Sequence, residues 1–392
     1  MQGRSTWSGL RHRGGTLLAG VLATAGLALG ASAEPYALVD LGVDVSPEDV
    51  SGLRVVVGSR ALTPGSTTAF LYSPADGSIR DLDGTIARAV NDAGIVVGDT
   101  ATGAFVFDGS TTVELPDAGA RGINEDGWVA GYVEIDNPYR PSPRPRAPAL
   151  YDGTDWQILG TAKVYQRGTR QGVYADLFVL EDVNGSLTAV GTKSRSGLYG
   201  SSAIRTPPPP AVDEIEYLPI PGGGRAAAIN EAGLVVGTTG EDSSTQSHAH
   251  AFLLDGTSVT DLGTLKGGLH SSALDINESG RVVGSAWLST VETSLVQPEL
   301  YHAFLWEEGR GMLDLNDLVV APGWVLTSAT AINDAGDIVG SAIVAGQVHG
   351  YLLVADGQPP PPSDAPPAAD ASSDPRKRKA PLAVRGSKTR TD

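Results

Sequence analysis

Three histidines occupy the same position in three copies of a repeated motif. His250, His302 and His349 each stand directly before a small residue, an aromatic ring and a leucine, as in "HAFLL", "HAFLW" and "HGYLL". Imidazole is a common metal ligand, so this recurrence raises the question of a metal site. Equivalent positions in neighbouring repeats are on the order of 10 Å apart, far beyond the ~2 Å bonds of a zinc site. We therefore expect no metal and no cofactor, and each imidazole is expected to bond the backbone of the adjacent repeat.

Aromatic and basic side chains occur in or beside the longest connections between repeated segments. Tyr139 and Arg140 lie within "YVEIDNPYRPSPRPRAP", and Trp287 and Tyr301 flank the core of "AWLSTVETSLVQPELY". Variable loops on a rigid scaffold often carry function, and exposed aromatic rings can stack on sugars or peptides. Together with the three histidines, these four residues form the candidate ligand face. Tolerated insertions with half-buried aromatic packing are the alternative interpretation.

Known catalytic motifs are missing from the sequence. It contains no G-x-S-x-G, no H-E-x-x-H and no phosphate-binding G-x-x-x-x-G-K-[ST]. Pairs of carboxylates can cleave glycosidic bonds, but the chain has 45 Asp and Glu residues, so the sequence singles out no pair. We therefore predict no catalytic residue, and the interpretation leans towards a protein that is not an enzyme.

These candidates are carried by a long-period repeat, which is an architectural signal. Six copies share an Asn that is followed seven residues later by a Gly, and a degenerate first copy has Ser51 and Gly58 in these places. The Asn and Gly pairs are Asn91 and Gly98, Asn124 and Gly131, Asn184 and Gly191, Asn230 and Gly237, Asn277 and Gly284, and Asn333 and Gly340.

Each copy predicts two successive β-hairpins. An Asn followed by two polar or small residues and a Gly suits a tight turn, with Gly in the left-handed position at residues 94, 127, 233, 280 and 336. Apolar β-branched residues flank the turn, so both sides are typical of strands. The Gly that closes the motif permits the close approach of a neighbouring backbone. A second hairpin follows, as in "HAFLLDGTSVTDL", so one unit contains four short strands.

The two ends of the repeated region complete each other. The last unit ends at "HGYLLVADG" without a fourth strand, whereas residues 36–42, "YALVDLG", form an unpartnered copy of that strand. A ring removes sheet edges that would otherwise be exposed. We therefore predict an all-β, seven-bladed β-propeller of four-stranded blades, closed when the N-terminal strand joins the last blade. An open solenoid is the alternative, but it would need capping repeats.

The repeat also resembles a known family. The segments "HAFLL", "HAFLW", "DLGTLKGG" and "INESGRVVGS" are similar to the HAF-repeat family of extracellular bacterial repeat proteins. The resemblance is close over residues 225–353 and weaker over residues 36–224. It implies a secreted repeat protein, and it supplies neither a reaction nor binding residues.

The two ends of the chain are predicted to lie outside the fold. Residues 1–33 combine early arginines, the apolar run "TLLAGVLATAGLALG" and a small-residue site "ASA", which together indicate a cleaved secretory signal. Residues 358–392 are rich in Pro, Ala and Ser around the basic cluster "RKRK", a composition typical of disorder. The predicted propeller therefore occupies residues 34–357, and we expect an exported, periplasmic or extracellular protein without a membrane span after cleavage.

Composition limits the range of partners. The formal net charge is −17, and such a surface disfavours nucleic acid, whose binding depends on clustered Lys and Arg. The chain has no cysteine, which excludes disulfides and thiolate chemistry. We expect a monomeric, non-catalytic binding module that recognises an exported protein or an envelope polysaccharide through its variable loops. A hydrolase or lyase acting on polysaccharide or peptide, and a purely structural envelope component, are the alternatives.

Overall fold

The structure is a computed structural model, in which the chain divides into two units, Met1–Ala33 and Glu34–Asp392. The structure describes residues 36–137, 144–167, 171–196, 200–209, 214–240, 248–290 and 297–356, all of which belong to the second unit. The predicted signal segment and the predicted Pro-rich tail lie outside these residues, so their assignments stay predictions.

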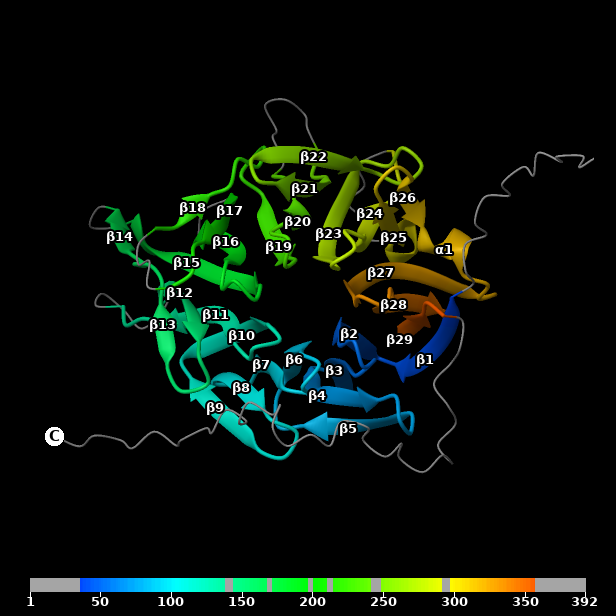
Figure 1. Ribbon diagram of the computed structural model, residues 1–392, viewed down its shortest axis with the longest axis horizontal. Coiled ribbons are helices and arrows are strands. Elements are labelled where there is room, and N and C mark those ends of the chain that lie inside the picture. Colours follow the sequence, from blue (N-terminus) through cyan, green and yellow to red (C-terminus); the bar gives the residue numbers. More distant parts are fainter. Residues whose placement is uncertain are drawn as a thin grey trace, which may run out of the picture. The chain divides into compact units, whose positions relative to one another are not determined.

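The second unit is a propeller-like arrangement of small antiparallel sheets (Figure 1). Five of these sheets contain four strands each. Two of the five come first in the chain, and their strands are β2 (Val45–Val50), β3 (Val56–Thr63), β4 (Ser66–Ser73), β5 (Ser78–Leu82), β6 (Ile86–Val90), β7 (Val96–Asp99), β8 (Gly103–Phe107) and β9 (Thr112–Pro116). Two more follow in the second half, with strands β19 (Arg225–Ile229), β20 (Val235–Thr238), β21 (Ala251–Asp255), β22 (Ser258–Gly263), β23 (His270–Ile276), β24 (Val282–Trp287), β25 (Tyr301–Glu307) and β26 (Gly311–Asp314).

The fifth four-stranded sheet joins the two ends of the described chain. Its order is β1-β29-β28-β27, and its strands are β1 (Ala37–Val43), β27 (Trp324–Ile332), β28 (Ile338–Val344) and β29 (Gln347–Val354). Strand β1 runs antiparallel to β29, from the pair Ala37 and Val354 to the pair Val43 and His349. The first strand is therefore the fourth strand of the last sheet, as the sequence predicted for residues 36–42.

The remaining strands form one nine-stranded sheet. They are β10 (Ala118–Ile123), β11 (Val129–Glu134), β12 (Arg146–Tyr151), β13 (Trp156–Ile158), β14 (Val164–Arg167), β15 (Gln171–Val183), β16 (Ala189–Arg195), β17 (Ser201–Thr206) and β18 (Glu216–Tyr217). Seven separate four-stranded blades were predicted, and this sheet is a departure from that prediction. Strand β15 is 13 residues long, which lets Leu177 pair with Arg146 of β12 in a parallel bridge that connects two groups of strands.

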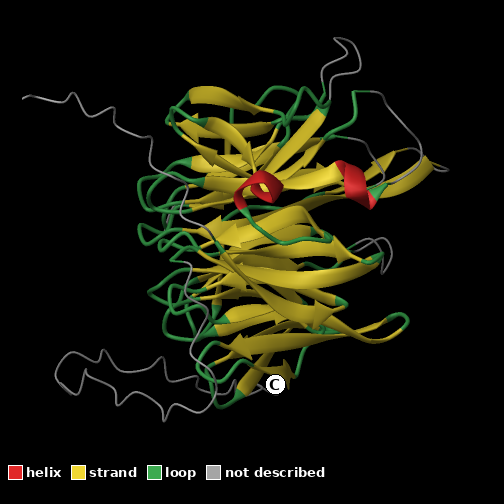
Figure 2. Ribbon diagram, turned by 90° about the vertical axis from the view of Figure 1, so that its right-hand side faces the viewer, coloured by secondary structure: helices red, strands yellow, loops and turns green. Residues whose placement is uncertain are grey.

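The first strand of each repeat lies closest to the centre of the arrangement (Figure 1). Turns and loops gather at the two faces of the molecule, and helix within the described residues is confined to two short segments (Figure 2). These segments are the 3₁₀ helix η1 (Pro298–Leu300) and α1 (Leu315–Leu318). We call the face that carries the Asn turns the turn face and the opposite face the variable face. Among the described residues, no helix has the length and apolarity needed to cross a membrane.

The apolar core is divided among the interfaces between neighbouring repeats. One cluster joins Val57 and Leu71 of the first sheet to Val96 and Phe105 of the second. The aromatic residue that follows the His position or its equivalent is fully buried in five repeats, at Phe70, Phe105, Phe252, Phe304 and Tyr351. Burying one such ring contributes about 1.5–3 kcal/mol, so each repeat is held by its neighbours.

The repeated glycines have two structural roles that the sequence predicted. The turn glycines have positive φ, for example +76° at Gly94 and +77° at Gly280, which is the left-handed conformation that favours Gly. The closing glycines lie against backbone, because a Cβ at Gly98 would stand 2.1 Å from the Ile86 carbonyl oxygen. A side chain at that position would force the first two strands of the repeat apart.

Candidate functional site: the central channel

The three predicted histidines pair with carboxylates of their own sheet. The distance from Nδ1 to the nearest Asp oxygen is 2.9 Å for His250 and Asp261, 2.8 Å for His302 and Asp314, and 3.0 Å for His349 and Asp40. The expectation that each imidazole bonds the backbone of the adjacent repeat was therefore wrong. In these three repeats the Asp of the fourth strand pairs with the aromatic residue two positions after the His, so its carboxylate can reach the imidazole. A carboxylate is a stronger acceptor than a backbone carbonyl.

The His302 pair is the most enclosed of the three. Burial alone would raise the pKa of Asp314, but hydrogen bonds from His302, Lys266 and Asn316 hold it well below its usual range. Asp314 also accepts the backbone N–H of Asn316 and caps α1. This pair therefore fixes a loop, and the part of the chain that the structure describes contains no group of His, Cys, Asp and Glu that could hold a metal.

Two of the predicted aromatic residues lie together on the variable face. Trp287 stacks on Tyr301 at 5.7 Å between ring centroids and on His270 at 5.4 Å, and His270 meets His248 edge-on at 5.0 Å. Trp287 is buried, so most of its surface is used in packing. Tyr139 and Arg140 lie outside the described residues, and their place on the candidate ligand face stays a prediction.

The sequence interpretation missed a ring of side chains at the centre of the molecule. In each repeat, the first strand carries a β-bulge that interrupts its register with the second strand. The bulged residue stands three positions before the Asn, or before Ser51 in the first repeat. We call these seven residues the channel ring: Glu48, Arg88, Arg121, Glu181, Ala227, Leu274 and Thr330.

The closing glycine of each repeat makes this bulge possible. Gly98 pairs with Ala87, the residue just before the bulge, and Gly284 pairs likewise with Ala273. A Cβ at Gly284 would stand 2.0 Å from the Ser272 carbonyl oxygen, so the bulged backbone requires Gly opposite it. A β-bulge re-aims a side chain, and here it directs the bulged residue towards the centre of the molecule.

All seven members of the channel ring line one cavity of about 520 Å³. The cavity also contacts residues near the variable-face ends of the first two strands of several repeats, among them Thr192, Arg225, Thr238 and Ser272. We call this space the central channel. Its volume lies within the range of ~300–1,000 Å³ that is usual for sites binding small molecules.

The wall of the channel is charged on one side. Arg88 and Arg121 share Asp99, at 3.1 Å and 2.6 Å, and Arg88 also lies 3.3 Å from Glu48. Burial raises the pKa of Glu48, and the nearby Arg88 opposes this rise. These four groups therefore satisfy one another at neutral pH.

Glu181 is the exception in this charged wall. It makes no hydrogen bond or ion pair with the described residues, although it lies beside the arginines. Burial raises the pKa of Glu181, while the charges of Arg121, Arg88 and Arg225 oppose the rise. A carboxylate in this position is available to a ligand.

On the turn-face side of the channel ring, side chains cross-link the backbone of neighbouring repeats. Asp49 accepts the N–H of Val50 in its own repeat and that of Val90 in the next. Asp182 and Asp275 likewise each accept one N–H from their own repeat and one from the next. The repeated Asn then donates from Nδ2 to the backbone oxygen at the Asn position, or at Ser51, of the next repeat. These bonds run from Asn91 to 124, Asn124 to 184, Asn184 to 230, Asn230 to 277, Asn277 to 333 and Asn333 to Ser51, at 3.0–3.2 Å.

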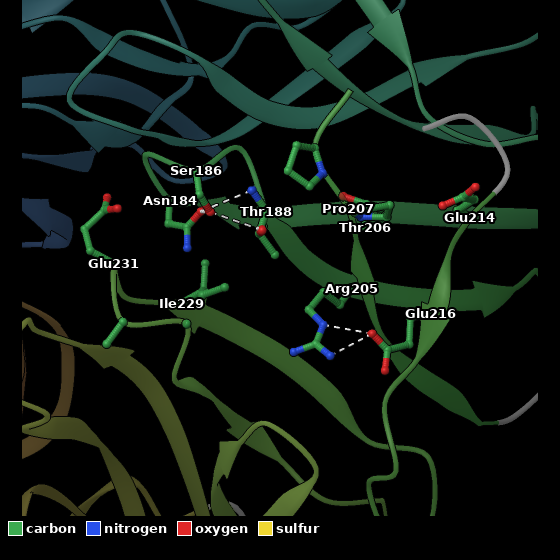
Figure 3. A pocket seen from close by; sticks show the side chains of 13 residues that line it. Asn184, Ser186, Thr188, Arg205, Thr206, Pro207, Glu214, Glu216, Ile229 and Glu231 are labelled. Atoms are coloured by element: carbon green, nitrogen blue, oxygen red, sulfur yellow. Dashed lines mark hydrogen bonds and ion pairs between the residues drawn. The ribbon is translucent and has the colours of Figure 1, made fainter. Parts of the chain in front are cut away.

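A second cavity, also about 520 Å³, lies at the turn face between β17, β18 and the turn after β19 (Figure 3). Its arginine is already paired, since Arg205 lies 2.7 Å from Glu216. Glu231, on the other side, accepts the backbone N–H of Gly185 at 2.7 Å. We call this space the edge pocket. Its Arg205 and Glu231 are already engaged in contacts within the fold, unlike Glu181 of the central channel.

A positional signal in the sequence could have identified the channel ring. When the seven repeats are aligned on the Asn, the position three residues earlier is Glu, Arg, Arg, Glu, Ala, Leu and Thr. Arg88 and Arg121 stand there between small residues, whereas Glu48 and Glu181 are each followed by a second acidic residue. The bulge that turns them towards the channel is a three-dimensional feature, and the strand periodicity alone does not predict it.

Comparison with known proteins leaves the function open. Residues 192–359 match a family described as "Protein of unknown function (DUF3466)". No curated protein matches the sequence. Three solved structures are similar in fold: the uncomplexed Pyrococcus horikoshii acylaminoacyl peptidase, a Mycobacterium tuberculosis puromycin-hydrolyzing peptidase and a Trypanosoma rangeli sialidase.

All three likenesses are distant. Their sequence identities to this chain are 11%, 13% and 9%, and their TM-scores are 0.47, 0.34 and 0.35, in the same order. The matches cover 82%, 82% and 72% of this chain, but only 52%, 59% and 55% of those structures. The matched region thus spans little more than half of each of those chains.

Proposed function

We propose that this chain is an exported, non-catalytic binding protein whose ligand enters the central channel from the variable face. One observation carries the proposal: the seven bulged residues share a backbone geometry but differ in chemistry, and all line one cavity. A fold that repeats its supports while varying the residues that face a cavity has the arrangement of a binding site on a rigid scaffold.

The proposal includes a closed ring of seven blades. In this interpretation the nine-stranded sheet counts as two blades, because only the parallel bridge between Arg146 and Leu177 connects its two groups of strands. The pairing of β1 with β29 supports closure, and so does the hydrogen bond from Asn333 to Ser51, which continues the Asn bonds across the chain ends.

Export and family membership belong to the same proposal. The basic and apolar start of the chain supports a secretory signal, and the "HAF" segments support membership of the HAF-repeat family. The long connections that the sequence predicts for the variable face include Tyr139 and Arg140. We propose that they meet an exported protein or an envelope polysaccharide while the channel itself takes a small polar molecule or a chain end.

The test is to block the channel with one substitution. Ala227→Trp places a large ring on the channel wall, and Val320→Trp adds the same ring at a side chain that is 89% exposed. The full-length proteins are screened by ligand-observed NMR against amino acids, short peptides, neutral sugars and sugar acids. We expect at least one solute to bind the wild type and the Val320 variant but not the Ala227 variant.

A negative result is equally clear. If both folded variants treat every solute as the wild type does, the central channel is not a binding site. Thermal melting of the two variants beside the wild type shows whether each is folded. If both variants retain a partner in a pull-down from exported fractions, the binding surface lies on the loops and not in the channel.

A second candidate function is hydrolysis or lyase chemistry in the same channel. Glu48 and Glu181 both have raised pKa values because of burial, as a general acid requires, and both line the cavity. Incubation with envelope polysaccharides should then release products with a bell-shaped pH profile, and Glu181→Gln should abolish the release. Absence of products from every polymer would leave the binding function alone.

A further inference from the structure

Glu181, Thr192 and Arg225 line the central channel, and their side chains have no partner among the described residues. The hydroxyl of Thr192 is buried and has no hydrogen-bond partner in the structure. The guanidinium of Arg225 makes no ion pair or hydrogen bond within the described chain, and the same holds for Glu181. Buried polar groups are almost always paired, so the orphaned hydroxyl of Thr192 points to a ligand. The half-buried Glu181 and the exposed Arg225 line the same cavity and can reach that ligand.

The repeat geometry brings Thr192 and Arg225 together. Thr192 stands eight residues after Asn184, and Thr238 stands eight residues after Asn230. In the next repeat along, Ser272 lies five residues before Asn277 and its hydroxyl is 2.5 Å from that of Thr238. Arg225 is the counterpart of Ser272, five residues before Asn230, so it occupies the place where Thr192 would otherwise find a hydroxyl partner.

A guanidinium beside a hydroxyl is a site for a carboxylate. Arg donates two parallel hydrogen bonds to a carboxylate, and a Thr hydroxyl adds a third. A simple anion would be disfavoured, because the carboxylate of Glu181 lines the same cavity. A simple cation would be disfavoured in turn by Arg225.

We propose that the central channel binds a free α-amino acid, with its carboxylate on Arg225 and Thr192 and its ammonium group on Glu181. This inference rests on the proposed binding function and names the ligand class for that site. The apolar part of the wall is formed by Val179, Ala226, Ala227, Ala273 and Leu274. An aliphatic side chain would contact these residues, so leucine, isoleucine and valine are the preferred ligands.

The experiment is calorimetric titration of the full-length protein with individual L-amino acids. For the tightest ligand, the amine without the carboxylate and the acid without the ammonium group are titrated as well. Each analogue should bind about tenfold more weakly or worse, because it leaves a charged group of the site unpaired. Aspartate and lysine should also bind more weakly than the aliphatic amino acids.

Variants assign the two ends of the ligand. Arg225→Met keeps much of the side-chain length without the charge, and it should weaken binding about tenfold or more, whereas Arg225→Lys should restore part of the loss. Glu181→Gln should weaken the amino acid but not the acid analogue. Arg60→Met, at the exposed ion pair of Arg60 with Asp81, is the matched control and should change nothing.

Two results overturn the inference. One is that no L-amino acid binds, and the other is that the analogues or the Arg225→Met variant bind as tightly as the full ligand binds the wild type. If a sugar acid or peptide binds instead and the Ala227→Trp substitution abolishes it, the proposed binding function stands and the amino-acid ligand is wrong. If nothing binds in either experiment, both the proposed binding function and the amino-acid ligand are wrong.

Discussion

The two sides of the channel ring differ in chemistry although their backbones are alike. The first four repeats contribute Glu48, Arg88, Arg121 and Glu181, whereas the last three contribute Ala227, Leu274 and Thr330. The last three repeats instead carry their His and Asp pairs on the third and fourth strands.

The features that both sides share are those that the fold needs. Both sides keep the bulge, the Gly opposite it and the cross-repeat Asn bonds, so these features hold the repeats together. The residue at the bulge varies from arginine to alanine without any change in strand pairing. Its identity is therefore free to serve binding.

The largest expected effect comes from removing the repeated Asn, whose hydrogen bonds should stabilise the two sides of the channel ring equally. Asn124 and Asn277 are both buried, and each donates to the next repeat while its oxygen accepts a backbone N–H of its own turn. Asn124→Ala and Asn277→Ala should each lower the free energy of unfolding by about 2–4 kcal/mol, because buried groups lose their partners. Urea unfolding measures the free-energy loss in each variant. Clearly unequal losses would contradict the view that the Asn bonds support both sides of the channel ring equally.

The second prediction concerns the carboxylates below the ring. Burial raises the pKa of Asp49 to about 6, against hydrogen bonds from the backbone of Val90 and Val50. The folded protein therefore keeps a proton that the unfolded chain, with its pKa of 3.8, has released. This contribution to stability is full below pH ~4 and is lost as the pH rises through ~6, and it amounts to at most about 3 kcal/mol.

Asp49→Asn isolates this contribution. The amide cannot accept both N–H bonds, so the variant should be less stable than the wild type at pH ~4. The difference should shrink as the pH rises to ~7, because only the wild type carries the cost of an ionised buried carboxylate. The measurement is the unfolding free energy of both proteins across this pH range. If it depends on pH in the same way in the two proteins, the pKa of Asp49 is not raised.

The third prediction contrasts the two walls of the channel directly. Arg121→Leu leaves Asp99 with Arg88 as its remaining ion-pair partner and removes a positive charge near Glu181, so it should cost about 1–2 kcal/mol. Leu274→Ala, on the uncharged wall, removes atoms that face the cavity and should cost less than about 1 kcal/mol. Thermal melting in low and high salt compares them, and only the Arg121 variant should depend on salt. Equal losses would mean that the charges do not matter to the fold.

Much of the architecture could be predicted from the sequence, because it depends on local turn and strand chemistry. The Asn turns, the left-handed glycines and the pairing of residues 36–42 with the last repeat follow from such patterns. The nine-stranded sheet could not be predicted, since β15 reaches β12 only because an insertion extends it. The channel ring was missed because a bulge shifts the strand register by one residue, and the strand pattern does not reveal that shift. The sequence identified His250, His302 and His349 as a set, but their carboxylate partners are 11, 12 and 309 residues away.

The smallest expected effect distinguishes the histidine pairs of the uncharged side. His302 and Asp314 are 17% and 2% exposed, whereas His250 and Asp261 are 30% and 62% exposed. His302→Ala should therefore destabilise the protein by about 1 kcal/mol, because a buried carboxylate loses one of its donors, and Lys266 remains to limit the loss. His250→Ala should change stability by less than about 0.5 kcal/mol, as is usual for exposed pairs. If the two variants melt at the same temperature, the His and Asp pairs are surface features throughout, and the last three repeats are held by their apolar interfaces and Asn bonds alone.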